Sequence, residues 1–126
     1  MGKNIGLAVL VLLLVGGVIW QSVYIKGSTD KLMDSLLQVR TALKRGDADA
    51  ALQKADEFGA LWEQEKSTYE ALFEHKEVDT ISAKARSLTG LCTDNTLPQA
   101  LSLTDEMLFY LDHIYCIDCL SWENIF

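Results

Sequence analysis

Residues 5–25 read IGLAVLVLLLVGGVIWQSVYI, which is 21 positions without a charged side chain. A helix of this length spans about 30 Å, the thickness of a bilayer's hydrocarbon core. The stretch is apolar on every helical face, so it has no polar stripe to turn toward water. Trp20 and Tyr24 suit the headgroup region, and Lys3 and Lys26 bracket the stretch. We therefore predict a membrane anchor over residues 1–26.

A cleaved secretory signal is the main competing interpretation of this stretch. Such signals have an apolar region of about 7–15 residues, followed by small residues at the cleavage site. The run here is longer, and the positions from Trp20 to Ile25 are bulky, so an uncleaved anchor is favoured over a signal or a buried soluble helix. Basic residues flank both ends, so charge does not fix the orientation. The short amino-terminal tail is easily retained inside, and we expect the bulk of the chain to be extracytoplasmic.

The remaining 100 residues, 27–126, suffice for one domain. They carry nine basic and 18 acidic residues, a net charge of −9 that disfavours nucleic acid as a partner. One proline, few glycines and many Leu and Ala residues predict helices throughout. The predicted fold class is therefore all-α, with an N-terminal transmembrane helix followed by a small antiparallel bundle of three or four helices.

Turn signals divide this domain. Gly27–Asp30 is the only pause after the anchor, and its Ser, Thr and Asp side chains suit the cap of a new helix. Gly46 and Asp47 predict the stop of that helix and the cap of the next. Around His75 the helical spacing of apolar residues is interrupted, but no helix-breaking residue is present. The sequence is therefore compatible with either a turn or a continuous helix at this point. Thr93–Thr96 predicts a further loop.

His113, Cys116 and Cys119 form a His-x-x-Cys-x-x-Cys pattern near the end of the chain. Two thiolates and an imidazole can bind zinc, but a closed site needs a fourth ligand, which Cys92 or His75 would have to supply. A disulfide between Cys116 and Cys119 is the second interpretation. Packing as small apolar residues is the third, and the odd cysteine count favours it. We predict no resident metal or cofactor, and keep a thiol or metal module as the alternative function.

His75, Glu77 and Asp79 form a second polar cluster. On a helix His75 and Asp79 lie one turn apart, which can orient an imidazole for proton transfer or form a local ion pair. Neither a nucleophile nor a phosphate-binding loop accompanies them. We therefore favour a solvated or capping role and predict that the protein is not an enzyme.

Aromatic and acidic side chains complete the inventory. The aromatic residues at helical spacing are predicted to lie in the core rather than in a ligand site: Trp62, Tyr69, Phe73, Phe109 and Tyr110. The acidic residues of the second helix are interpreted as a solvated face: Asp56, Glu57, Glu63 and Glu65. The terminal apolar residues are predicted to dock on the bundle, with contact to a partner as the alternative: Trp122, Ile125 and Phe126.

The span, the Trp62 region, the His75-Lys-Glu-Val-Asp79 motif, His113-Ile114 and the closing Asn124-Ile125-Phe126 together resemble a bacterial family catalogued as domain of unknown function 4363. The resemblance covers nearly the whole chain. It implies a short protein of Gram-positive, often spore-forming bacteria, with one amino-terminal membrane segment and a helical domain.

The resembled family carries no assigned activity, so it implies no catalytic residue here. It marks two motifs of unknown role, a central one at His75, Glu77 and Asp79, and a tail at Ser121, Asn124, Ile125 and Phe126. Cys116 and Cys119 depart from its pattern, which is more usually polar or acidic there. We expect a membrane-anchored helical scaffold that binds an unidentified membrane or envelope protein, in envelope or sporulation processes by analogy.

Overall fold

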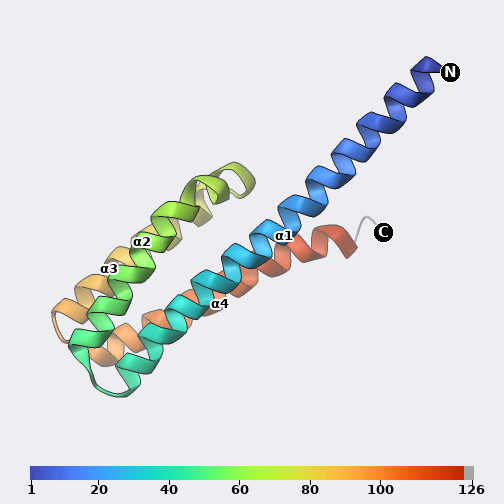
Figure 1. The fold of residues 1–126 in the computed structure, drawn as a ribbon. Helices are drawn as coiled ribbons and strands as arrows, with labels where there is room; N and C mark the ends of the chain where they lie inside the picture. Colours follow the sequence, from blue (N-terminus) through green and yellow to red (C-terminus); the bar gives the residue numbers. More distant parts are fainter. Residues whose placement is uncertain (124–126) are drawn as a thin grey trace.

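The computed structural model describes the backbone of residues 1–123 and the side chains of residues 1–114. Four helices follow one another in the described residues: α1 (Gly2–Lys44), α2 (Ala48–Leu72), α3 (His75–Thr93) and α4 (Leu97–Glu123). They alternate in direction, and α1 and α3 each pack against both α2 and α4 (Figure 1). No strand occurs in the described backbone, and the predicted all-α class is confirmed.

The first helix is the main departure from the sequence-based prediction. The helix expected to begin at Ser28, Thr29 or Asp30 begins instead at Gly2 and runs without interruption to Lys44. At 1.5 Å per residue α1 is about 65 Å long. The expected cap was wrong because Ser28 and Thr29 are buried inside α1 and bond to side chains of α2.

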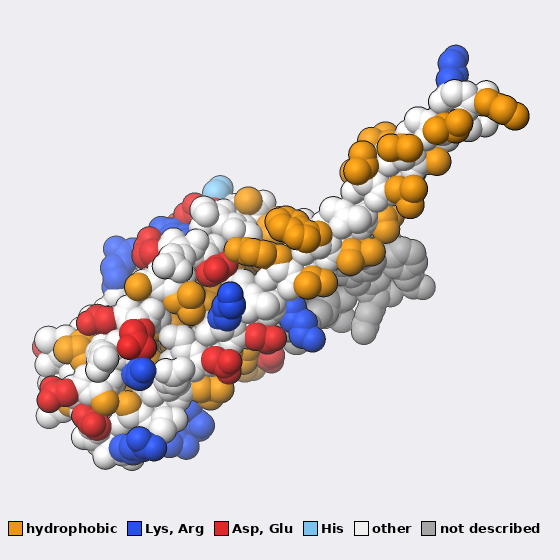
Figure 2. All heavy atoms as spheres, viewed as in Figure 1, with side chains coloured by type: hydrophobic (Ala, Val, Ile, Leu, Met, Phe, Trp, Pro, Cys, Tyr) orange, Lys and Arg blue, Asp and Glu red, His pale blue; other side chains and the backbone are white. Residues whose placement is uncertain are grey.

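The two halves of α1 have different surroundings. No residue from Met1 to Tyr24 is buried, and large apolar side chains there are exposed, including Leu12 at 70% and Leu13 at 69%. This half is long and apolar enough to cross a membrane by length and composition. Figure 2 shows hydrophobic side chains covering it, whereas charged side chains gather over the bundle. From Ile25 onward, α1 supplies one wall of the bundle.

The core lies between the four helices. Ile25, the last residue of the uncharged stretch, has no exposed surface and belongs to this core. Trp62, Tyr69 and Phe58 are its largest fully buried side chains. The other large apolar side chains that are fully enclosed lie on the inward faces of these helices: Leu32, Leu36, Val39, Val78, Leu88, Met107, Leu111 and Ile114.

The turns lie close to where the sequence places them. Gly46 has φ of +72°, a left-handed conformation that favours glycine. Asp47 caps α2 by accepting a hydrogen bond from the Ala50 backbone N–H at 3.1 Å. Near His75 the open question is settled as a turn, since α2 ends at Leu72 and α3 begins at His75. The loop after α3 occupies residues 94–96.

Replacing Asp47 with alanine is expected to lower the free energy of unfolding by about 1 kcal/mol, because one backbone donor of α2 loses its acceptor. Chemical denaturation of the full chain in detergent micelles measures this change. Asp47→Asn is the matched control, since an asparagine oxygen also caps a helix, and it should lie close to the wild type. Equal losses for both variants would contradict the capping role.

Candidate functional site at the anchor–bundle junction

The His75, Glu77 and Asp79 motif lies in the first two turns of α3, at the end of the bundle that faces the exposed half of α1 (Figure 1). His75 and Asp79 are exposed and Glu77 is half-buried. Glu77 sits in the first turn of α3, where the helix dipole stabilises a carboxylate. Within residues 1–114, no hydrogen bond or ion pair joins these three side chains. The positions of these side chains agree with the favoured solvated or helix-terminal role, and proton transfer stays the alternative.

His113 lies on α4 and its ring stacks on Phe109, with centroids 6.4 Å apart and planes inclined by 6°. Cys116 and Cys119 follow on the same helix, but their side chains lie outside the described residues. Within residues 1–114, no group of three His, Cys, Asp or Glu side chains is arranged to hold a metal ion. The disulfide, metal and packing hypotheses for Cys116 and Cys119 therefore stay predictions.

Cys92 is a poor candidate for the fourth ligand of such a site. It lies in the last turn of α3, next to the loop that leads into α4. His113 lies roughly 24 Å further along α4, at 1.5 Å per residue from Leu97. Cys92 is also buried and free. Burial raises the pKa of the Cys92 thiol and the Asp56 carboxylate raises it further, which disfavours the thiolate that zinc needs.

The predictions for the aromatic side chains are only partly correct. Trp62 and Tyr69 are buried, and Phe73 and Tyr110 pack against the core with part of their surface exposed. The prediction for Phe109 was wrong, because 73% of its surface is exposed on α4. Helical periodicity did not separate Phe109 from its neighbour Leu108, which packs against the core. Asn124, Ile125 and Phe126 lie outside the described residues, as do the side chains of Ser121 and Trp122.

A hydrogen-bonded cluster joins α1 to α2 at the point where α1 enters the bundle. One carboxylate oxygen of Glu65, Oε2, accepts from the Tyr24 hydroxyl at 2.9 Å and from Ser28 Oγ at 2.8 Å. Deeper in, Thr29 Oγ1 and the Tyr69 hydroxyl lie 2.8 Å apart in a buried hydrogen bond. These five residues, which we call the junction cluster, fix α2 to the helix that carries the apolar half.

Local sequence patterns do not predict this cluster, because they assign its members to the apolar stretch, a helix cap, an acidic face and the core. Glu65 was interpreted as part of a solvated face, and this was wrong, since it accepts two hydrogen bonds from α1. A signal was nevertheless present. Tyr24 and Ser28 are four residues apart, as are Glu65 and Tyr69, so each pair lies on one helical face. Only the packing of α1 against α2 brings the two faces together.

Tyr69 connects this cluster to the core. Its ring lies 5.3 Å from that of Trp62 and 5.5 Å from that of Phe73, measured between centroids. Trp62 in turn donates its indole N–H to Ser82 Oγ on α3 at 2.9 Å. Burial raises the pKa of the Tyr69 hydroxyl, and the neighbouring Ser28 and Thr29 hydroxyls oppose that rise only in part. The junction cluster is therefore continuous with the interior of the bundle.

Above about pH 10 the wild type is expected to lose stability as pH rises. An unfolded tyrosine gives up its proton near pH 10, whereas Tyr69 keeps its proton to higher pH in the folded state. Unfolding then releases a proton, so stability falls as pH rises toward the folded pKa. Tyr69→Phe should be less stable at pH 8, because Thr29 loses its partner, and should show a shallower loss between pH 9 and 11. Denaturation of the full chain in micelles across this range measures both effects.

Tyr110→Phe is the matched control for this titration, because it removes a tyrosine hydroxyl from α4 and leaves the junction cluster intact. It should keep the wild-type slope. If Tyr69→Phe and the wild type lost stability in parallel, the buried hydroxyl would have no part in the alkaline transition.

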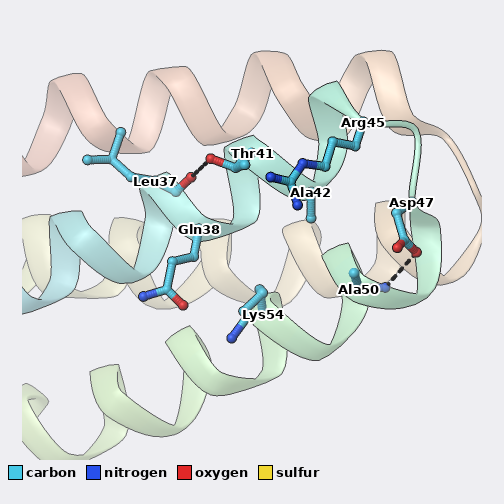
Figure 3. A pocket seen from close by; sticks show the side chains of 8 residues that line it. All are labelled: Leu37, Gln38, Thr41, Ala42, Arg45, Asp47, Ala50 and Lys54. Carbon is cyan, nitrogen blue, oxygen red and sulfur yellow. Dashed lines mark hydrogen bonds between the residues drawn. The ribbon is translucent and has the colours of Figure 1, made fainter.

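A shallow pocket of about 350 Å³ lies at the opposite end of the bundle, beside the turn between α1 and α2 (Figure 3). Three of its polar side chains make local contacts. Thr41 Oγ1 donates to the Leu37 carbonyl at 2.9 Å, Asp47 caps α2, and Lys54 pairs with Glu57 at 3.2 Å.

Comparison with known proteins identifies the family. Residues 19–125 match the model of the family described as Domain of unknown function (DUF4363). The chain belongs to this family. The DUF4363 match begins in the last part of the apolar stretch and includes the junction cluster and all of the bundle helices. No curated protein and no solved structure matches the chain. The suspected resemblance is thereby confirmed, and the DUF4363 domain in this chain is the four-helix bundle with its junction.

Proposed function

We propose that this protein is a membrane-anchored, extracytoplasmic scaffold that holds its bundle at the membrane surface for an unidentified membrane or envelope protein. The proposal assigns no catalytic role to His75, Glu77 or Asp79. Its mechanism is tethering, because confining a binding surface to the membrane raises its effective concentration for a neighbour, to about millimolar for short tethers.

The continuity of α1 carries this proposal. One helix supplies both the exposed apolar half and a wall of the bundle, so the orientation of the span fixes the orientation of the bundle. The junction cluster adds hydrogen bonds from α1 to α2 where a flexible linker would otherwise allow the bundle to tumble. A rigid connection of this kind suits a protein that presents a binding surface at a fixed distance from the membrane and at a fixed angle to it.

The surface of α4 offers a contact for a partner. Phe109 exposes 73% of its surface, and its ring stacks on that of His113. Large aromatic side chains are enriched in interfaces because they bury much apolar area with few rotatable bonds. Net charge after Lys26 is −9, which favours a partner surface with basic residues.

Topology is tested by labelling intact cells with a membrane-impermeant maleimide. The test uses Gln53→Cys, at an exposed position of α2, in a chain whose Cys116 and Cys119 are replaced by serine. Cys92 remains as the internal control, because it is buried and should react only after denaturation. Labelling of intact cells supports the extracytoplasmic arrangement. Labelling only after the cells are opened would place the bundle in the cytoplasm.

Partner binding is tested by placing a photo-crosslinking phenylalanine analogue at position 109 in cells. The same analogue at exposed Glu63 on α2 is the matched control. We expect one discrete protein adduct from position 109 and a much weaker one from position 63. Absence of any adduct from either position, or from other exposed bundle positions, would contradict the scaffold proposal.

A further inference from the structure

A groove of about 730 Å³ lies between α1 and the end of α2, next to the junction cluster. The α1 side is formed by Gly17, Val18, Trp20, Gln21 and Tyr24, and the α2 side by Ser67, Thr68, Ala71 and Leu72. The groove is therefore the space where the exposed half of α1 separates from the bundle.

The lining of this groove is apolar with a few hydrogen-bonding groups. Val18, Trp20, Ala71 and Leu72 present hydrocarbon surface, and a side chain added at Gly17 would meet no heavy atom within 4 Å of its Cβ. The Ser67 and Thr68 hydroxyls and the Gln21 amide add hydrogen-bond donors. An apolar groove with few donors suits a hydrocarbon chain that ends in a polar ester.

The position of the groove decides what lies beside it. If α1 crosses a bilayer, about 20 residues of the apolar stretch lie in the hydrocarbon core, which then extends from Ile5 to about Tyr24. The groove then faces the outermost part of that core, because its α1 wall begins at Gly17. Trp20 and Tyr24 stack at this level, with ring centroids 5.8 Å apart, as aromatic side chains do at membrane interfaces. The neighbouring molecule at this depth is a lipid.

We propose that the junction groove binds one acyl chain of a membrane phospholipid, with an ester carbonyl accepting hydrogen bonds from the Ser67 and Thr68 hydroxyls. This inference rests on the membrane anchoring in the proposed function. A zwitterionic lipid fits best. Glu65, Glu70 and Glu74 lie around the end of α2, and although Lys66 pairs with Glu70 at 3.8 Å, the net charge of these four side chains is negative and repels anionic headgroups. The bound lipid fills the space between the anchor and the bundle. It packs against α1 at the level where α2 ends and no longer contacts α1.

The test uses the full chain in phosphatidylcholine nanodiscs that contain a small fraction of phosphatidylcholine with a diazirine on its acyl chain. After photolysis and trypsin digestion, adducts are assigned to three peptides: Asn4–Lys26 of α1, Ser67–Lys76 at the groove, and Ala55–Lys66 of α2 below it. We expect adducts on Asn4–Lys26 and Ser67–Lys76 and none on Ala55–Lys66. If Asn4–Lys26 were labelled and Ser67–Lys76 were not, lipid binding in the groove would be overturned and the membrane anchoring would stand. No adduct on Asn4–Lys26 would overturn the anchoring as well.

Two glycine variants separate binding in the groove from general contact with the bilayer. Gly17→Leu fills the groove and should lower the Ser67–Lys76 adduct yield roughly fivefold or more, while Asn4–Lys26 stays labelled. Gly16→Leu is the matched control, because its Cβ is equally unobstructed and Gly16 does not line the groove. Leucine favours a helix more than glycine does, so both variants should fold. An unchanged Ser67–Lys76 yield in Gly17→Leu would overturn the proposal.

Discussion

Trp62→Ala is expected to lower the free energy of unfolding by about 3–5 kcal/mol, the range for removing a buried aromatic side chain. Only 1% of the Trp62 surface is exposed, and the ring packs against Tyr69 at the centre of the bundle. The substitution also leaves Ser82 Oγ without the indole N–H that it accepts at 2.9 Å. Since small domains are stable by about 5–15 kcal/mol, this loss is a large part of the total.

Chemical denaturation of the full chain in micelles, followed by circular dichroism, measures the Trp62→Ala effect. Glu63→Ala is the matched control, because Glu63 is the exposed neighbour of Trp62 on α2, and it should stay within about 0.5 kcal/mol of the wild type. Ser82→Ala isolates the hydrogen bond and should cost about 1–3 kcal/mol. If Trp62→Ala lowered the free energy of unfolding by less than Ser82→Ala does, Trp62 would not be part of a packed core.

Lys26→Pro is expected to have the second large effect, a loss of about 3 kcal/mol or more together with a kink in α1. Proline at 26 removes the helical hydrogen bond from its backbone N–H and clashes with the preceding turn. The position lies between Ile25 in the core and Ser28 in the junction cluster. The kink should therefore separate Tyr24 from Glu65 and loosen the end of α2.

Hydrogen exchange of the chain in nanodiscs reports on this kink. In the wild type the amides of residues 24–30 should be as protected as those of the bundle, and in Lys26→Pro they should exchange much faster. Lys3→Pro is the matched control, because a helix tolerates proline in its first turn. Unchanged protection in Lys26→Pro would mean that α1 is already interrupted at this point.

Local signals in the sequence predicted the elements of the fold. The uncharged run of residues 5–25 indicated a long apolar helix, and Gly46 with Asp47 marked the first turn of the bundle. The turn at Gly46 and the cap at Asp47 are short-range effects, since a left-handed glycine and a capping carboxylate act on the backbone within a few residues. The structure confirms them for that reason.

The same local signals failed at the junction. Ser and Thr favour helix caps, but they are also accepted inside a helix when their hydroxyls find partners. Ser28 bonds to Glu65 and Thr29 to Tyr69, residues about forty positions away. The four-residue spacings place side chains on one face of each helix, but they do not indicate which two faces meet. The continuity of α1, the junction cluster and the groove beside it all depend on the packing of α1 against α2. They could be found only from the structure.

The continuity of α1 is tested most directly by a distance measurement along it. Spin labels at Val9→Cys and Lys44→Cys, both exposed positions, are placed in a chain with its native cysteines replaced, and double electron–electron resonance is recorded in nanodiscs. One straight helix predicts a single narrow distribution near 50 Å, from about 1.5 Å per residue. A broad or clearly shorter distribution would show that the apolar half of α1 and the bundle are joined by a flexible break, and would contradict the continuity of α1.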